Sequence, residues 1–190
     1  MRIYSINGDF DNYDACEIDF AACAKKHPDI EEYAMRFNLD GLSVASTWWP
    51  RKMKRYNDHP LGDYVSKLTN DVLILERQAI LKLSSILGNI EILPLECNFG
   101  DYWAINILDV LDCIDYEKAE FKCFSKRSEC DRPRIMRFIK FAFHSEKILD
   151  HHVFKIVDQP QSHIFVDDVF VDEVTKQNIT GFKFKLVWES

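Results

Sequence analysis

The segment LPLECNFGDYWAINILDVLDCIDYEKAEF, from Leu93 to Phe121, constrains the fold more than any other part of this chain. Leu93 to Cys97 is apolar and strand-like, and Asn98 to Asp101 contains the residue types of a hairpin loop. Tyr102 to Ile107 is aromatic and branched, as a returning strand would be. This order predicts two antiparallel strands joined by a short loop.

Other segments also have the composition and period of strands. Further strands are expected at Arg2–Ile6, Leu42–Trp49, Val72–Leu75, Arg134–Phe143, His152–Val157 and Gly181–Trp188. Aromatic residues on both faces of Arg134–Phe143 predict a central place in a sheet. The alternation in the last segment predicts that Phe182, Phe184, Leu186 and Trp188 share one face.

Helical patterns are fewer. Glu76–Leu87 has an apolar stripe that ends at Gly88, and Asp167–Gln177 is a short amphipathic candidate that uses Val169, Phe170 and Val174. Ala21–Phe37 is interrupted by Pro28, so its helix is expected to restart near Asp29. The fold class predicted is α+β, a mainly antiparallel β-sheet with a few packed helices.

The 190 residues are enough for a sizeable hydrophobic core, and a single domain over 1–190 is expected. A soft boundary at Asn57–Asp63 leaves room for an N-terminal sublobe over 1–60. The net charge of −7 argues against nucleic acid and favours a basic protein partner. The N-terminus does not resemble a secretory signal and no window is apolar enough to span a bilayer, so a cytoplasmic protein without membrane contact is expected.

Catalytic and metal-binding patterns are missing from the sequence. There is no GxSxG, GxxxxGK[ST] or GxGxxG motif and no CxxC spacing. His151 and His152 would point to opposite faces of a strand, which makes them a poor ligand pair. The cysteines are expected to be reduced thiols: Cys16, Cys23, Cys97, Cys113, Cys123 and Cys130. No catalytic residue, metal or cofactor is assigned.

Charged and aromatic clusters leave several interpretations open. Five acidic residues follow the hairpin: Asp109, Asp112, Asp115, Glu117 and Glu120. They form a solvated face, a partner-binding patch or a catalytic pair of carboxylates, in that order of preference. For the basic run 51–55, a solvated loop is the preferred interpretation and a nucleic-acid site is the alternative. In the Trp48–Trp49 pair, one ring is expected in the core and the other as an exposed anchor.

The C-terminal two thirds of the chain, from Asp71 onward, resemble a known family. The matching features are Leu93-Pro94-Leu95, Tyr102 followed by Asn106, Asp112 to Asp115, the strand Ile164–Val166, and Gly181–Phe184 closing in Val187–Trp188. In order and spacing these are similar to bacterial immunity proteins of polymorphic-toxin systems, of the Imm-eleven type. The first 70 residues match only loosely, through Trp48 or Trp49.

The resemblance implies a non-enzymatic protein that binds a cognate toxin domain and neutralises it by occluding its active site. Such toxins are often delivered between neighbouring cells by contact-dependent secretion, type VI secretion among them. The family supplies no catalytic residues, so the partner-binding candidates come from charge and aromatic character: Asp109, Asp112, Asp115, Glu117 and Trp49. The alternatives are an acid-residue, hydrolase-like enzyme and an adaptor or regulator whose partner is not a toxin.

Overall fold

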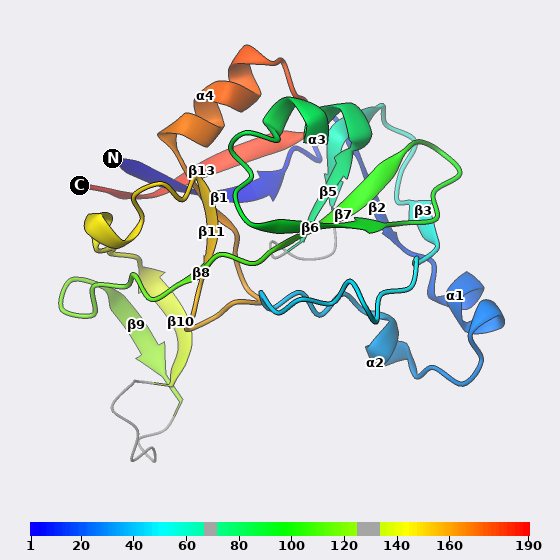
Figure 1. Cartoon of the computed structure of the whole chain (residues 1–190), viewed down its shortest axis with the longest axis horizontal. Coiled ribbons are helices and arrows are strands. Elements are labelled where there is room, and N and C mark those ends of the chain that lie inside the picture. Colours follow the sequence, from blue (N-terminus) through cyan, green and yellow to red (C-terminus); the bar gives the residue numbers. More distant parts are fainter. Residues whose placement is uncertain (67–71, 125–133) are drawn as a thin grey trace.

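Two large sheets and a separate hairpin contain the strands of this protein (Figure 1). The computed structural model describes residues 1–66, 72–124 and 134–190, without the side chains of residues 33 and 34. The five-stranded sheet has the order β13 (Phe182–Glu189), β1 (Arg2–Gly8), β12 (Phe165–Asp167), β11 (Val153–Ile156) and β8 (Val110–Leu111). The six-stranded sheet has the order β3 (Met53–Arg55), β2 (Asp14–Ile18), β4 (Leu61–Ser66), β5 (Leu73–Glu76), β7 (Tyr102–Ile107) and β6 (Ile90–Pro94).

Both large sheets are mixed. In the six-stranded sheet β2 and β4 run parallel, and in the five-stranded sheet β8 and β11 run parallel. The other strand pairs of the described residues are antiparallel. The α+β class is therefore confirmed, whereas the expectation of a mainly antiparallel sheet holds only in part.

The central core lies where the two large sheets meet, and it is covered by helices α3 (Arg77–Leu83) and α4 (Asp168–Lys176). Leu73 and Leu75 of β5 belong to this core, while Ile74 between them belongs to a second core on the other face of the sheet. Because successive side chains of a strand point to opposite faces, β5 is buried on both sides. This explains its continuous apolar sequence.

Two outer cores complete the packing. One packs α1 (Phe20–Lys26) and the segment around Trp48 and Trp49 against the six-stranded sheet, near α2 (Glu32–Met35). The other packs Phe138 of β10 (Ile135–Lys140) and Ile148, which follows the 3-10 turn η1 (Ser145–Lys147), against the five-stranded sheet. Strand β9 (Glu120–Cys123) pairs with β10 to form the hairpin. The hairpin extends away from the body of the molecule in Figure 1.

The hairpin that the sequence predicts after Leu93 is confirmed. Strands β6 and β7 pair antiparallel from Ile90 opposite Ile107 to Pro94 opposite Trp103. The predicted helix after β5 is confirmed as well. The Glu76 side chain caps its first turn by accepting a hydrogen bond from the Gln78 N–H. The helix ends earlier than predicted, at Leu83 with Ser84 as its C-cap, and a turn separates it from Gly88, which has φ +66°.

One expected strand and the expected position of another are wrong. Residues 42–49 form turns and irregular chain, because this segment is held by side-chain hydrogen bonds instead of a strand ladder. Within Arg134–Phe143, β10 is not central: among the described residues it pairs only with β9. Met136 and Ile139 are exposed there, so apolar residues on both faces did not mean burial on both faces.

Two expected faces are also partly wrong. The pairing of β1 with β13 shifts register between Ile3, opposite Trp188, and Tyr4, opposite Leu186. This irregularity breaks the alternation, and Leu186 is exposed. In α4, Phe170 and Val174 are buried as predicted, but Val169 is exposed.

A close contact between backbones joins the end of the chain to β4. Gly181 has φ +89°, and a Cβ atom there would lie 2.2 Å from the Tyr64 carbonyl oxygen. The Asp63 carboxylate accepts hydrogen bonds from the N–H and the hydroxyl of Thr180, both at 2.7 Å. The two large sheets are therefore linked at this point by residues from β4 and from the start of β13.

Candidate functional site

Two of the candidate acidic residues are engaged within the fold. The Asp109 carboxylate lies 3.1 Å from Nδ1 of His151 and accepts the Asn89 N–H. Asp115 is 5% exposed; its carboxylate accepts the N–H groups of Glu117 and Lys118 and pairs with Nζ of Lys118 at 2.8 Å. The hydrogen bond from Lys118 lowers the pKa of Asp115. These carboxylates order the chain around β8.

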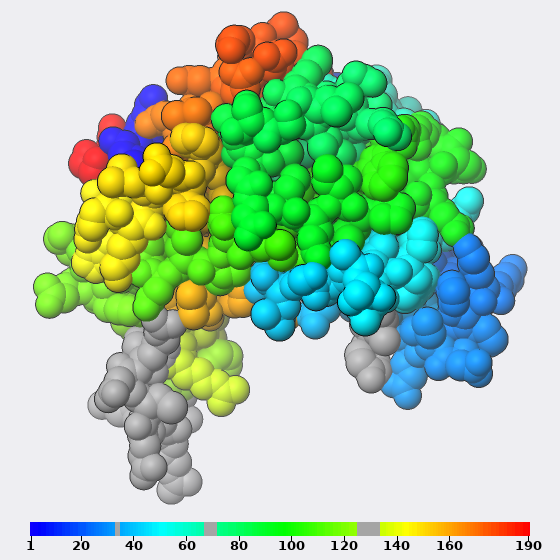
Figure 2. All heavy atoms as spheres, viewed as in Figure 1, coloured from blue at the N-terminus to red at the C-terminus, as the bar shows by residue number. Residues whose placement is uncertain are grey.

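The remaining acidic candidates face outward. Asp112 and Glu117 are exposed, as is Glu120 at the start of β9. The green to yellow-green segment that contains them lies at one end of the molecule (Figure 2). Trp49 belongs to a different segment, before β3, and no contact among the described residues joins it to these carboxylates. The five candidates thus do not form one cluster.

Trp48 and Trp49 enclose the side chain of Arg51. The guanidinium carbon lies 4.1 Å from the ring centroid of Trp48 and 4.2 Å from that of Trp49. Both indoles are half-buried, so the expected division into one core ring and one exposed ring is not what the structure has. Trp48 also stacks on Phe37 and donates from Nε1 to the Pro94 carbonyl, which holds its segment against β6.

Arg51 itself is 7% exposed, although it begins the basic run that the sequence places in a solvated loop. Its Nε donates to the Met35 carbonyl at 3.4 Å and its Nη1 donates to the Trp49 carbonyl at 2.6 Å. Burial lowers the pKa of Arg51 to about 10, so the group remains a cation at neutral pH. The end of the run is ordered as well, since Nε of Arg55 lies 2.7 Å from the buried Asp14 carboxylate.

A pocket of about 110 Å³ opens beside Arg51. Its polar lining comes from Arg36, Asn38, Thr47 and Arg51, and its apolar lining from Trp48 and two aliphatic side chains. The segment that contributes Thr47 and Trp48 crosses the lower part of the face shown in Figure 2, below the green strands. This pocket concentrates positive charge on a protein whose net charge is negative.

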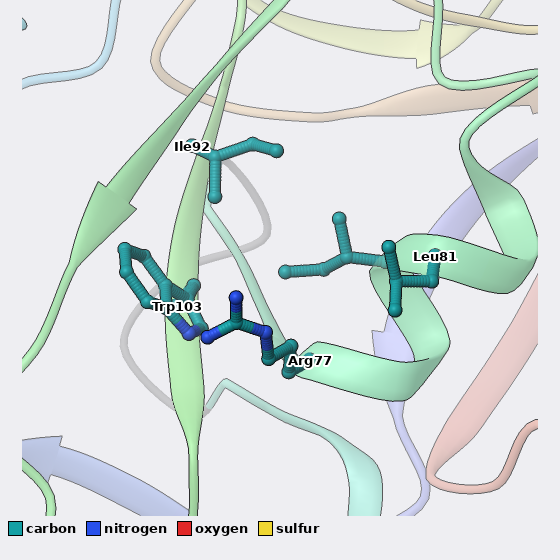
Figure 3. A pocket seen from close by; sticks show the side chains of 5 residues that line it. Arg77, Leu81, Ile92 and Trp103 are labelled. Carbon is teal, nitrogen blue, oxygen red and sulfur yellow. The ribbon is translucent and has the colours of Figure 1, made fainter.

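A second pocket, of about 150 Å³, lies between α3 and strands β6 and β7. Figure 3 shows Arg77, Leu81, Ile92 and Trp103 around it, and Leu81 and Ile92 are exposed. The Arg77 guanidinium lies 5.8 Å from the Trp103 ring centroid and 3.5 Å from the Asp101 carboxylate. The arginine of this second pocket therefore already has an acidic partner, whereas the described residues provide none for Arg51.

One carboxylate fixes the segment that borders the first pocket. Glu91 of β6 accepts hydrogen bonds from the Ser43 hydroxyl, the N–H groups of Val44 and Ala45, and the amide of Asn106. Burial alone would raise the pKa of Glu91, but these donors outweigh it and lower the pKa to about 2. The irregular chain after residue 42 is thereby held against the six-stranded sheet.

The histidine pair is divided between two carboxylates. His151 contacts Asp109, and Nδ1 of His152 lies 2.9 Å from Asp167. Within residues 1–66, 72–124 and 134–190, no group of three or more His, Cys, Asp or Glu side chains is placed to hold a metal ion. The five cysteines in these ranges are free thiols, and Cys130 lies outside them.

Neither of these two pockets has Asp or Glu in its lining, so neither provides the convergent carboxylates that an acid-residue enzyme needs. Among the described helices, none is long and apolar enough to cross a bilayer. Each of these two pockets instead contains an arginine beside a tryptophan. Both residue types are enriched at the centres of protein–protein interfaces.

Sequence reasoning missed Arg51, Glu91 and the pocket at Arg77. An isolated Glu in an apolar strand, as in Ile90-Glu91-Ile92, was a usable signal, because a charged residue there needs a partner. The Trp-Trp-Pro-Arg order offered a weaker one for Arg51. The Arg77 pocket combines residues from three elements, so no local pattern in the sequence indicates it.

Comparison with known proteins gives one family match. No curated protein matches the chain. Residues 97–188 match the model described as the Immunity protein family (Imm11). The matched region begins in the loop before β7 and ends in β13, later than the start at Asp71 that the sequence resemblance indicates. From residue 97 to residue 188 the chain is similar to the Imm11 immunity proteins, and the resemblance noted in its sequence is confirmed.

Proposed function

We propose that this chain is an immunity protein that binds a cognate toxin domain in the bacterial cytoplasm and neutralises it by covering the toxin's active site. The match of residues 97–188 to the Imm11 immunity family carries this proposal. Proteins with this role act by binding, so they need a complementary surface and no catalytic centre. Type VI secretion is the proposed route by which the toxin reaches the cell.

The charge distribution supports a basic toxin surface as the partner. The net charge of −7 gives the protein an overall negative potential, which speeds the encounter with a basic partner. Asp112 and Glu117 are exposed and close together in the sequence. We propose them as the first contacts, with Asp109 and Asp115 holding their segment in place.

The aromatic residues around Arg51 support a second part of the contact. Trp49 is half-buried and fixed between Arg51 and His27, whose ring centroid lies 4.5 Å from that of Trp49. A ring that is already held loses little conformational freedom when it binds, which favours affinity. Charge then steers the encounter and the ordered aromatic surface supplies affinity.

Rescue of growth tests the proposed function. A gene immediately upstream that encodes a large protein with a C-terminal toxin domain identifies the candidate toxin. That domain is expressed in a bacterial host with and without this chain, and growth is recorded. The proposal predicts growth arrest by the toxin alone and restored growth with both. Arrest in both cultures, at matched expression of the two proteins, would contradict it.

A further inference from the structure

Arg51 is a buried cation for which the described residues provide no acidic partner. Arg51 is 7% exposed, and none of the ion pairs of the described residues includes it. Arg55 and Arg77, by contrast, each pair with a carboxylate. Removing a charge from water is costly unless an opposite charge or good hydrogen bonds replace the lost hydration.

The contacts of Arg51 compensate for only part of this cost. Two backbone carbonyls accept from Nε and Nη1, and two indole faces cover the guanidinium plane. A guanidinium has five N–H donors, and the described hydrogen bonds use Nε and Nη1 only. The group therefore has hydrogen-bonding capacity left at Nη2, in a side chain that lines an open pocket.

The rest of the lining also suits an anion. Arg36 adds a second positive charge, and its own ion pair with Glu32 is long, at 3.6 Å, and exposed. The Asn38 oxygen already accepts from Gln161, which leaves its amide nitrogen, a donor, for a ligand. Thr47 also lines the pocket, but its hydroxyl already donates to the Val44 carbonyl at 3.2 Å. With a volume of about 110 Å³ the pocket has room for a carboxylate group and a short alkyl stem.

We propose that the Arg51 pocket binds the carboxylate of an acidic side chain from the protein partner. This inference rests on the proposed function for the identity of that partner, which is the toxin domain. Arginine binds a carboxylate by charge-assisted hydrogen bonds in its plane, and the two indoles hold that plane in advance. The protein then recognises its partner by two opposite charges: exposed Asp112 and Glu117 meet basic residues, while the Arg51 pocket receives an acidic one.

The first experiment uses a small probe and the full chain. N-acetylglutamate is titrated while the indole N–H signals of the four tryptophans are followed by NMR. We expect saturable shifts at Trp48 and Trp49, with N-acetylglutamine, which lacks the charge, producing none. Inorganic phosphate is titrated in parallel to separate a carboxylate site from a general oxyanion site.

Three variants locate the response. Arg51→Met removes the cation, and Thr47→Glu, at an exposed position, brings a competing carboxylate into the pocket without disturbing the buried core. Both are expected to weaken N-acetylglutamate binding about tenfold or more, as the loss of a charge-assisted hydrogen bond does. Arg77→Met, which removes the other arginine near a tryptophan, is the matched control and should bind like the wild type. Circular dichroism verifies that each variant is folded.

Several results would overturn the inference. These are the absence of saturable shifts, equal shifts with N-acetylglutamine, tighter binding of phosphate than of N-acetylglutamate, or unchanged binding by Thr47→Glu.

The toxin domain provides the final comparison. Thr47→Glu should weaken the complex about tenfold or more, while Thr175→Glu, the same change at an exposed threonine of α4 outside both pockets, leaves it unchanged. A wild-type chain that binds the probe but not the toxin contradicts the proposed function. A toxin complex of equal affinity with the wild type and Thr47→Glu contradicts the carboxylate site alone.

Discussion

At the scale of single residues, buried or half-buried charges determine how this protein is held together. The Glu91 carboxylate takes the place of a strand ladder, because it accepts hydrogen bonds from four donors in two segments of the chain, residues 43–45 and Asn106. Asp14 has a similar role, since it accepts from Arg55 and from the Ala15 and Asn57 N–H groups. Each of these carboxylates fixes irregular chain that a propensity-based reading cannot place.

Replacing Glu91 by Gln should destabilise the fold. Gln keeps the shape but loses the charge, and its NH2 group would oppose the N–H donors that Glu91 accepts. We expect the free energy of unfolding to fall by about 2 kcal/mol at neutral pH, from the loss of charge-assisted hydrogen bonds. Urea denaturation of the wild type and the variant measures the difference.

The pH dependence of this difference and a control variant make the test specific. Glu91 has a pKa of about 2 in the folded chain and an ordinary value of 4.5. Its stabilisation is therefore complete above about pH 4.5 and is lost as the pH falls toward 2. Glu96→Gln, which breaks only the surface pair with Lys26, should cost less than about 1 kcal/mol. A difference that stays constant down to pH 2 would contradict the role given to Glu91.

At the scale of elements, helices and strands with a strong local sequence pattern could be predicted. Features that depend on a partner far away in the sequence could not. The β6–β7 hairpin and helix α3 follow from turn residues, caps and periodicity close in sequence. The irregular pairing of β13 with β1 depends on strands at opposite ends of the chain, so Leu186 could not be assigned to the surface beforehand. The burial of Arg51 could not be predicted either, because its guanidinium donates to carbonyl groups of Met35 and Trp49 that only the fold brings together.

The joint between β4 and β13 gives a prediction for an element contact. Gly181→Ala should destabilise the protein by about 2 kcal/mol or more, because it combines a positive φ with a Cβ atom in collision with backbone. Gly8→Ala is the control: its Cβ would meet only the ring of the exposed Phe10, which can move. Thermal unfolding of both variants measures the effect. Equal loss of stability in Gly181→Ala and Gly8→Ala would show that the close backbone contact at Gly181 does not require glycine.

At the scale of the whole molecule, we propose that residues 1–190 form one domain. The first 60 residues contribute β1 to one large sheet and β2 and β3 to the other, and the central core takes side chains from both sheets. Shared cores favour cooperative unfolding. We therefore expect a single transition, with fluorescence and circular dichroism changing together in denaturant. Two separated transitions would indicate a sublobe at the N-terminus.

The exposed acidic residues give a prediction for association with the proposed toxin partner. The pair of substitutions Asp112→Asn and Glu117→Gln should slow association several-fold at low salt, with less effect at high salt, because steering is electrostatic. Asp29→Asn with Glu31→Gln makes the same change in net charge at another exposed site and serves as the control. Stopped-flow or surface-based kinetics compare the two. Equal slowing by both pairs would mean that only the net charge matters.

The most direct test of the proposed immunity function is inhibition of the purified candidate toxin domain by this purified chain. The toxin's activity is measured while the chain is added in increasing amounts, and the mixture is analysed by size-exclusion chromatography. We predict a stable complex and loss of toxin activity that is complete at a fixed stoichiometric ratio. Full toxin activity in the presence of excess chain, with the two proteins eluting separately, would contradict the assignment.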